Sequence, residues 1–148
     1  MSNVKILSQY IKDLSFNIEN TPAIFLTPKD KPNIALSIDI DAKKIGEDTF
    51  EISLKIVADA QNNDEQFFKC DITYAGIFQI GQIDNDMIEQ ILLIYCPNLL
   101  FPYLRRIISN LTTDAGLAPL MIDPIDFATL YTKRKQAENS TPVNDTKN

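Results

Sequence analysis

The sequence predicts an α+β fold, in which a four-stranded antiparallel sheet carries two main C-terminal helices on one face. Three observations support this prediction. Apolar and polar residues alternate over four stretches before residue 80, which is the period of a strand. From Asp84 onward the apolar residues recur three or four positions apart, which is the period of a helix. The strands precede the helices without alternating with them, which favours an antiparallel sheet.

The first three strands are predicted from strict alternation of apolar and polar residues. They are expected at Leu14–Ile18, at residues 34–41 and at residues 50–57, with a hairpin turn at residues 43–48. A fourth strand is expected at residues 67–78, after a polar turn at residues 61–64. This strand differs because Phe67 and Ile77 make both of its faces apolar. A strand of this kind is expected to lie under helices or to meet another chain.

The helices are predicted from Asp84 to Gly116 and again after Asp123. Pro97 and Pro102 are expected to kink or break the first helical stretch, and Gly116 to end it as the C′ residue. Asp123 and the proline after it are expected to open the last helix as its N-cap and N1 residues. The sequence becomes polar after Lys133. We therefore expect one domain at residues 1–135 and a disordered tail at residues 136–148.

Composition excludes several classes of function. The chain has a net charge of −6, and between Pro32 and Cys96 twelve acidic residues stand against four basic ones, so a nucleic-acid interface is not expected. This acidity favours basic partners, or serves solubility alone. No apolar run reaches the length of a membrane span, and no signal peptide is visible, so we expect a cytosolic chain with no membrane insertion. Cys70 and Cys96 are expected to be reduced, buried thiols.

The usual catalytic groups are missing. The chain has no histidine, two separated cysteines and four glycines, and it shows neither a phosphate-binding loop nor a zinc motif. Asp39 with Asp41, and Asp84 with Asp86, are carboxylate pairs that a hydrolase or a magnesium site would need. Their positions on strands and turns favour solvation or capping instead. We expect no enzymatic activity, no metal and no cofactor.

The residues from Cys96 to Tyr131 resemble the protein-export chaperone family SecB. The resemblance rests on Cys96-Pro97-Asn98-Leu99-Leu100-Phe101-Pro102-Tyr103, Arg105, Ser109, Gly116, Pro119-Leu120, Pro124-Ile125-Asp126-Phe127 and Leu130-Tyr131. Two earlier segments match as well, Lys12-Asp13-Leu14-Ser15-Phe16 and Tyr74-Ala75-Gly76-Ile77-Phe78. The match covers roughly residues 10–131.

This resemblance implies a homotetramer, built as a dimer of dimers, that holds unfolded precursor proteins and delivers them to the translocation ATPase SecA. It implies a SecA-binding surface on the first and fourth strands, at Asp13, Asn17, Glu19, Lys69 and Asp71. Asn17 and Lys69 depart from the family pattern and put the strength of SecA docking in doubt. The expected substrate-binding residues are Phe68, Phe101, Phe127 and Tyr131. The alternative is that these four residues only pack in the hydrophobic core. The expected oligomer contacts are Cys70, Ile72 and Tyr74.

Three other functions remain open at this point. The first is a SecB-like holdase that is not coupled to export and serves a regulatory partner, for example a toxin–antitoxin system. The second is a structural oligomeric adaptor with one fixed partner. An acid-based hydrolase is the weakest of the alternatives.

Overall fold

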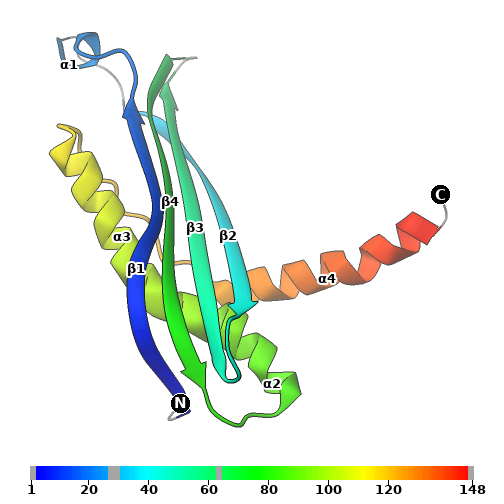
Figure 1. Cartoon of the computed structure of the whole chain (residues 1–148). Helices are drawn as coiled ribbons and strands as arrows, with labels where there is room; N and C mark the ends of the chain where they lie inside the picture. Colours follow the sequence, from blue (N-terminus) through cyan, green and yellow to red (C-terminus); the bar gives the residue numbers. More distant parts are fainter. Residues whose placement is uncertain (1–2, 27–30, 63–64, 147–148) are drawn as a thin grey trace.

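The computed structural model describes residues 3–26, 31–62 and 65–146, with side chains as far as residue 139. Four long antiparallel strands form one sheet in the order β1-β4-β3-β2 (Figure 1). The strands are β1 (Val4–Ile18), β2 (Asn33–Lys44), β3 (Thr49–Asn62) and β4 (Glu65–Ile80). The helical elements are α1 (Ala23–Leu26), α2 (Asn85–Gln90), the π-helical η1 (Ile91–Tyr95), α3 (Cys96–Asp114) and α4 (Phe127–Thr146).

This arrangement confirms the predicted α+β fold with its antiparallel sheet and C-terminal helices. β1 is longer than expected, and its pairing with β4 is irregular between Ile6 and Ser8 and between Ile11 and Asp13. The short helix α1 was not expected from the sequence. The predicted turn at residues 61–64 includes residues 63–64, which lie outside the described part of the chain.

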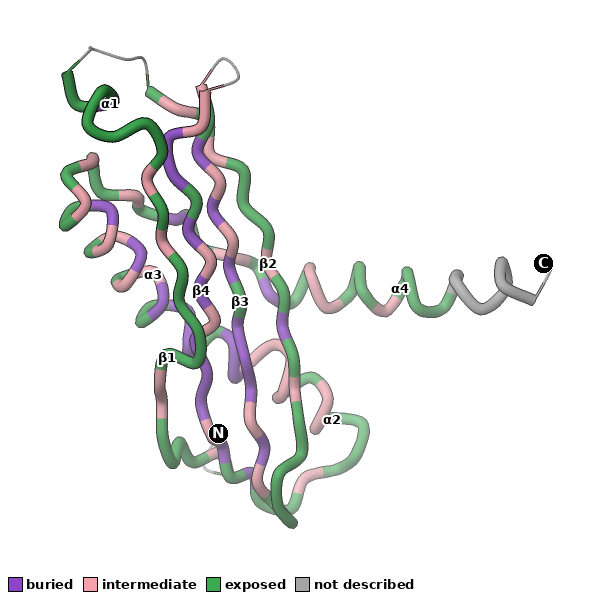
Figure 2. The backbone as a smooth tube through the Cα atoms, turned by 45° about the horizontal axis from the view of Figure 1, so that its top comes forward, coloured by how far each residue is buried: buried purple, intermediate pink, exposed green. Residues whose placement is uncertain are grey.

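The core lies between the sheet and α3. Even-numbered residues of β3 and β4 stand opposite one another on the face that α3 covers, and they include the cross-strand pair Ile56 and Ile72. Both of these side chains are fully buried, as are Leu100, Leu104 and Ile108 of α3. Each such burial stabilises the fold by roughly 1.5–3 kcal/mol. Figure 2 shows the same division, with the buried backbone concentrated in β3, β4 and one side of α3.

Of the predicted kink or break at the two prolines, the break is wrong, because the backbone stays helical from Asn85 to Asp114. Pro97 follows directly on the π-helical turn η1, in which the Cys96 N–H bonds to Ile91 O, and it supplies no N–H of its own. Pro102 lies inside α3 and removes one backbone hydrogen bond. Burial of Leu100 and Leu104 around it offsets that loss.

By length and composition alone this helical stretch would cross a membrane, since its mean hydropathy is 1.3. The sequence expectation of no membrane span rested on the absence of an unbroken apolar run of sufficient length. Core helices share this composition, and Leu100, Leu104 and Ile108 are buried in this chain against its own sheet. Packing on the sheet therefore accounts for the apolar face of α3.

Gly116 ends α3 as predicted. It has a φ of +86°, its N–H bonds to Thr113 O at 3.0 Å, and the Leu117 N–H bonds to Thr112 O at 2.9 Å. These two bonds form a Schellman motif, which satisfies the last carbonyls of the helix.

The start of α4 differs from the prediction. The N-cap is Asp126, not Asp123, because the Thr129 N–H and Thr129 Oγ1 donate to the Asp126 carboxylate at 3.0 and 2.8 Å. These bonds hold the pKa of Asp126 below its usual value. The helix continues to Thr146, so residues 136–146 are helical where a disordered tail was expected.

Candidate functional site

A crevice runs between the edge strand β2 and the helices η1 and α4. It contains two cavities, of about 380 and 230 Å³, which we call together the β2 crevice. The walls of the larger cavity are mainly apolar, and those of the smaller are mixed. The lining residues are Ile38, Asp39, Ile40, Asp41, Ala42, Glu89, Leu92, Leu93, Leu130, Tyr131, Arg134, Lys135 and Glu138.

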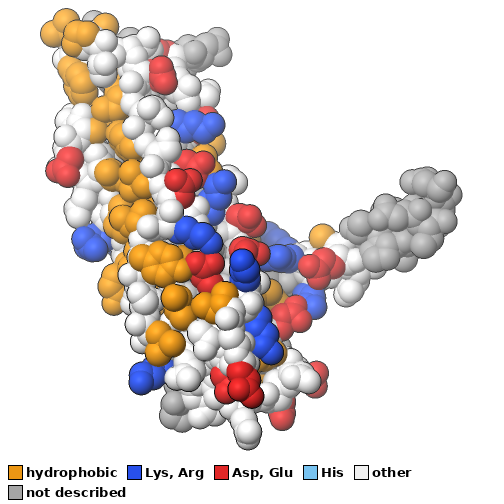
Figure 3. All heavy atoms as spheres, viewed as in Figure 1, with side chains coloured by type: hydrophobic (Ala, Val, Ile, Leu, Met, Phe, Trp, Pro, Cys, Tyr) orange, Lys and Arg blue, Asp and Glu red, His pale blue; other side chains and the backbone are white. Residues whose placement is uncertain are grey.

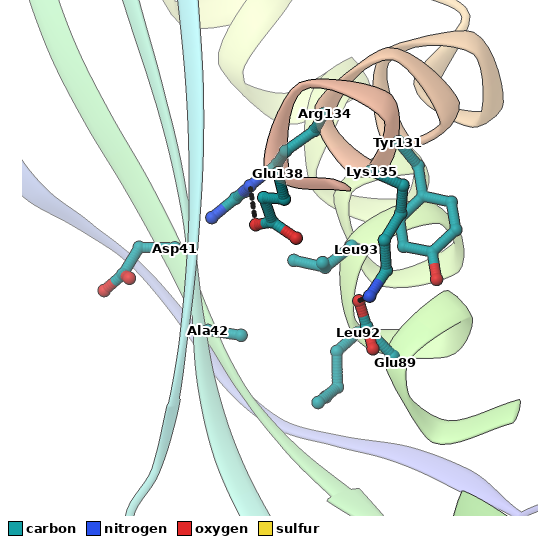
Figure 4. Close-up of a pocket in the computed structure, with 9 residues that line it drawn as sticks. All are labelled: Asp41, Ala42, Glu89, Leu92, Leu93, Tyr131, Arg134, Lys135 and Glu138. Atoms are coloured by element: carbon teal, nitrogen blue, oxygen red, sulfur yellow. Dashed lines mark ion pairs between the residues drawn. The ribbon is translucent and has the colours of Figure 1, made fainter. Parts of the chain in front are cut away.

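Polar contacts fix α4 over this crevice (Figure 4). Arg134 Nη1 donates to the carbonyl oxygen of Ile40 on β2 at 3.1 Å, and Lys135 Nζ lies 2.7 Å from Glu89 Oε1 of α2. The hydrogen bond to Glu89 raises the pKa of Lys135. Sequence reasoning missed both contacts because they join residues that are far apart in the chain.

An apolar groove lies toward the other end of β2. Its volume is about 390 Å³, and it is lined by Lys31, Pro32, Ile34, Phe67, Phe68, Leu117, Ala118, Pro119 and Leu120. One wall is the irregular segment that links α3 to α4. This segment is too apolar for a solvated loop, and its residues Leu117, Ala118, Pro119 and Leu120 pack beside the strand ends.

Thr112 ties this connecting segment to α3. Its hydroxyl accepts the Leu120 N–H at 2.9 Å and donates to the carbonyls of Ile108 and Ser109 at 3.1 and 3.0 Å. Thr112 is fully buried, so its hydroxyl has no water to bond to and relies on these backbone groups as partners. The hydroxyl therefore sets the position of one wall of the apolar groove.

The four aromatic residues predicted to bind substrate do not form one site. Phe68 lines the apolar groove and Tyr131 lines the β2 crevice. Phe101 and Phe127 contact each other edge to face, with ring centres 6.2 Å apart, and both are buried. These two rings lie in the core and leave almost no surface for a ligand.

The residues predicted to bind SecA lie on the outer face of the sheet, which is the face that α3 does not cover. Asp13, Asn17 and Lys69 are on that face with Asp71, because Asn17 pairs with Lys69 and Ser15 pairs with Asp71. Glu19 follows β1, and its N–H bonds to Phe67 O at 2.9 Å. The structure thus brings this predicted set to one region of β1 and β4.

Lysines interrupt the acidity of this outer face. Lys55 Nζ of β3 lies 3.9 Å from Asp71 Oδ2, and Lys69 stands beside Asn17. A shallow cavity of about 260 Å³ crosses the four strands between these charges. It is lined by Lys12, Asp13, Asp39, Asp41, Ser53, Lys55 and Thr73. Figure 3 shows acidic and basic side chains mixed over the middle of this face.

Asp39 and Asp41 were read from the sequence as solvated strand residues. The register places Asp39 opposite Lys55 and so extends the charged face to β2. Asp39, Asp41 and Asp71 all have odd numbers, and in the predicted hairpins odd-numbered residues share one face of the sheet. The sequence therefore already indicated this placement.

A second polar cluster ties β1 to β3 across β4. The Tyr10 hydroxyl donates to Glu51 Oε2, and Lys12 Nζ lies 2.8 Å from Glu51 Oε1. Burial and the bond to Glu51 raise the pKa of Tyr10 to about 12. The hydrogen bonds from Lys12 and Tyr10 lower the pKa of Glu51.

The predicted oligomer contacts lie inside the chain. Cys70 and Ile72 have no exposed surface, and they belong to β4, which is an inner strand. Tyr74 is 8% exposed, stacks on Tyr103 at 6.1 Å and accepts a bond from Gln9 Nε2 at 3.3 Å. Burial raises the thiol pKa of Cys70 to about 11 and that of Cys96 to about 12, which fits structural thiols.

Exposed apolar residues gather instead on β1, the other edge of the sheet. Four of them form what we call the β1 stripe: Ile6, Leu7, Ile11 and Leu14, whose exposures are 40, 48, 47 and 39%. Figure 3 shows apolar side chains running along this side of the molecule. Within the described ranges, no three histidine, cysteine, aspartate or glutamate side chains gather as metal ligands would.

Comparison with known proteins gives a consistent result. The family model described as "Preprotein translocase subunit SecB" matches residues 1–138. The chain is 40% identical to the protein-export protein SecB of Parvibaculum lavamentivorans over 133 residues, which are 90% of this chain and 79% of the relative. It is also 40% identical to the protein of that name from Rickettsia felis over 135 residues, which cover 90% of this chain and 89% of the relative.

The fold is shared with a SecB-like chaperone of Mycobacterium tuberculosis, solved in complex with a ChAD peptide from an antitoxin. The TM-score is 0.70 at 16% sequence identity, and the match covers 84% of this chain and 92% of the other.

Proposed function

The chain belongs to the SecB family, whose members are chaperones of protein export, and from this premise we propose its specific role. It binds unfolded precursor proteins in the cytosol, keeps them competent for translocation and delivers them to SecA. It does so without a cofactor, without enzymatic activity and without inserting into a membrane.

The observation that supports this proposal most strongly is the arrangement along β2. The apolar groove lies toward one end of this edge strand and the β2 crevice toward the other, so both border the same strand. An unfolded segment is extended and carries apolar side chains with free backbone groups. Apolar walls beside a strand edge offer contacts to both kinds of group.

We propose that SecA docks on the outer face of the sheet, around Asp13 and Asp71, with Glu19 adding charge beside them. The opposite face holds the apolar core and the β2 crevice. Client and SecA would therefore bind to different surfaces, and docking would not require release of the client.

We propose that the chain assembles as a homotetramer, a dimer of dimers, in which the β1 stripe forms one of the two kinds of contact. The stripe lies on an edge strand whose second side has no strand partner within the described sheet. A second copy would cover these apolar residues and pair with the open edge. This contact surface replaces the buried positions Cys70 and Ile72.

A refolding experiment tests the chaperone activity. A slow-folding secreted precursor, diluted from denaturant, should regain its structure more slowly in the presence of this chain, in proportion to chain concentration. An unchanged refolding rate at molar excess would contradict the proposal.

The second candidate, a SecB-like holdase not coupled to export, is favoured by Asn17, Lys69 and the pairing of Lys55 with Asp71. These features lower the negative charge where SecA would dock. Titration with the basic, zinc-bearing tail of SecA separates the two functions. Export coupling predicts binding that weakens in Asp13→Ala and Asp71→Ala and persists in Asp114→Ala, which removes equal charge at the end of α3. Absence of binding to the unmodified chain would favour the uncoupled holdase.

A further inference from the structure

Arg134 crosses the β2 crevice between its two cavities, and we propose that this side chain controls the entry of client segments. The inference rests on the proposed function, because it concerns the crevice that we assign to clients. It adds that the crevice is partly closed in the free chain, and that one residue closes it.

The closing contact is made to the backbone of the sheet. Arg134 Nη1 donates to the carbonyl oxygen of Ile40 at 3.1 Å. Ile40 belongs to β2, an edge strand that pairs only with β3 in the described sheet. A polypeptide that adds to such an edge supplies backbone N–H donors to its carbonyls. Arg134 therefore occupies, with a side-chain donor, the position that a donor of the client would take.

The position of this side chain divides the crevice. Arg134 lines both the 380 Å³ cavity and the 230 Å³ cavity, together with Leu93 and Tyr131. Figure 4 shows Arg134 reaching from α4 toward β2, while Leu92 and Leu93 approach from the helix below. Withdrawal of the guanidinium would open a wider channel between the two cavities, past Leu93 and Tyr131, beside the edge of β2.

The side chain is able to withdraw without unfolding its surroundings. It is half exposed, and Glu138, one helical turn later, lies 3.8 Å from Arg134 Nε. The carboxylate would keep the guanidinium paired after it leaves Ile40. The helix itself remains anchored, because Lys135 bonds to Glu89 and Phe127 is buried. The movable part is thus a side chain, and α4 need not shift.

The client suited to this channel is an extended, apolar segment. Ile38, Ile40, Leu93 and Leu130 supply its apolar walls, and the Ile40 carbonyl supplies a backbone acceptor. Such a segment gains the acceptor only when Arg134 releases it. The client and Arg134 therefore compete for this atom.

The test compares Arg134→Ala, Arg134→Lys and Lys133→Ala for binding to fluorescently labelled, reduced and S-alkylated pancreatic ribonuclease, a permanently unfolded chain. Lys133→Ala removes the same charge from the neighbouring position of α4 and leaves the contact to Ile40 intact. Arg134→Lys keeps a charged donor. Thermal unfolding of each variant shows that its fold is unchanged, which is expected because Arg134 is half exposed.

We expect Arg134→Ala to bind the ribonuclease about two- to fivefold more tightly than the unmodified chain, mainly through faster association, since one modest hydrogen bond no longer competes. Arg134→Lys and Lys133→Ala should stay close to the unmodified chain. Equal affinity in Arg134→Ala, or an equal gain in Lys133→Ala, would overturn the proposal. Weaker binding in Arg134→Ala would also overturn it, because Arg134 would then be a client contact. Failure of the unmodified chain to bind would instead reject the chaperone function.

Discussion

β1 and β2 are both edge strands of one sheet, yet one edge is bare and apolar while the other is bordered by helices and grooves. The β1 stripe presents Ile6, Leu7, Ile11 and Leu14 directly to solvent. Along β2, Arg134 bonds to the backbone, and two apolar depressions border the strand. A permanently exposed apolar edge needs a permanent partner, whereas a guarded edge suits a partner that comes and goes.

We therefore assign self-assembly to β1 and client binding to β2. Substitutions in β1 should therefore change self-assembly and leave client binding in place. Substitutions in β2 should change client binding and leave self-assembly in place. The predictions below follow from this separation, from the largest expected effect to the smallest.

The largest effect is expected from the double substitution Ile11→Lys and Leu14→Lys. Two charges on the β1 stripe would remain unpaired in a contact between copies, and two apolar side chains worth roughly 1.5–3 kcal/mol each would be lost from it. We expect the assembly to split into smaller units in a native mass measurement. Leu36→Lys, at a position of β2 with a similar exposure of 43%, should leave the assembly intact. The same mass for both variants would contradict the assignment of self-assembly to β1.

The next effect concerns the wall of the apolar groove. Thr112→Val removes the acceptor of the part-buried Leu120 N–H and should lower the free energy of unfolding by about 1–3 kcal/mol. Denaturant unfolding measures this loss. Thr113→Val is the matched control, because the Thr113 hydroxyl is exposed and bonds only to Ser109 O within its own helix. A similar loss in both variants would show that the tie to the connecting segment is unimportant.

The sequence predicted the strands, but it did not predict the contacts that build the crevice and the groove along β2. Alternation located β3 and β4, because their even-numbered residues face the core. The glycine at position 116 marked the end of α3, because glycine readily adopts the positive φ that the helix end requires. Alternation could not reveal that Arg134 reaches Ile40 or that Thr112 holds Leu120. Those contacts depend on how the elements pack, which local sequence does not encode.

Two local predictions failed for reasons that the structure explains. Pro97 follows a π-helical turn and Pro102 lies amid strong apolar packing, and the helix continues through both. Asp126 caps α4 in place of Asp123 because Thr129 offers it two donors. Cys70 and Ile72, the oligomer contacts that the family resemblance implies, face the core of the same chain.

A smaller effect is expected for client binding when Leu36 is changed. Leu36 stands on the helix-facing side of β2, between residues that line the apolar groove and the β2 crevice. A lysine there would remove apolar contact, so Leu36→Lys should weaken binding of the unfolded ribonuclease about tenfold, or about 1.4 kcal/mol. Fluorescence anisotropy measures the affinity. Unchanged affinity would remove β2 from the client surface.

The smallest effect is a dependence of α4 on pH. The folded-state pKa of Asp126 lies below its unfolded value of 3.8, so the stabilising contribution of the cap is complete above pH 3.8. It is lost as the pH falls through the lower folded-state pKa. Circular dichroism should therefore show less helix in Asp126→Asn at neutral pH, and the difference from the unmodified chain should shrink in acid. A difference that grows in acid would contradict this role for Asp126.

Hydrogen–deuterium exchange with and without the unfolded ribonuclease tests the separation of the two edges most directly. We predict that the client slows exchange in β2, in the segment that links α3 to α4 and in the first turns of α4, while β1 exchanges at the same rate in both samples. Slower exchange confined to β1, with β2 unchanged, would contradict the assignment of client binding to the guarded edge.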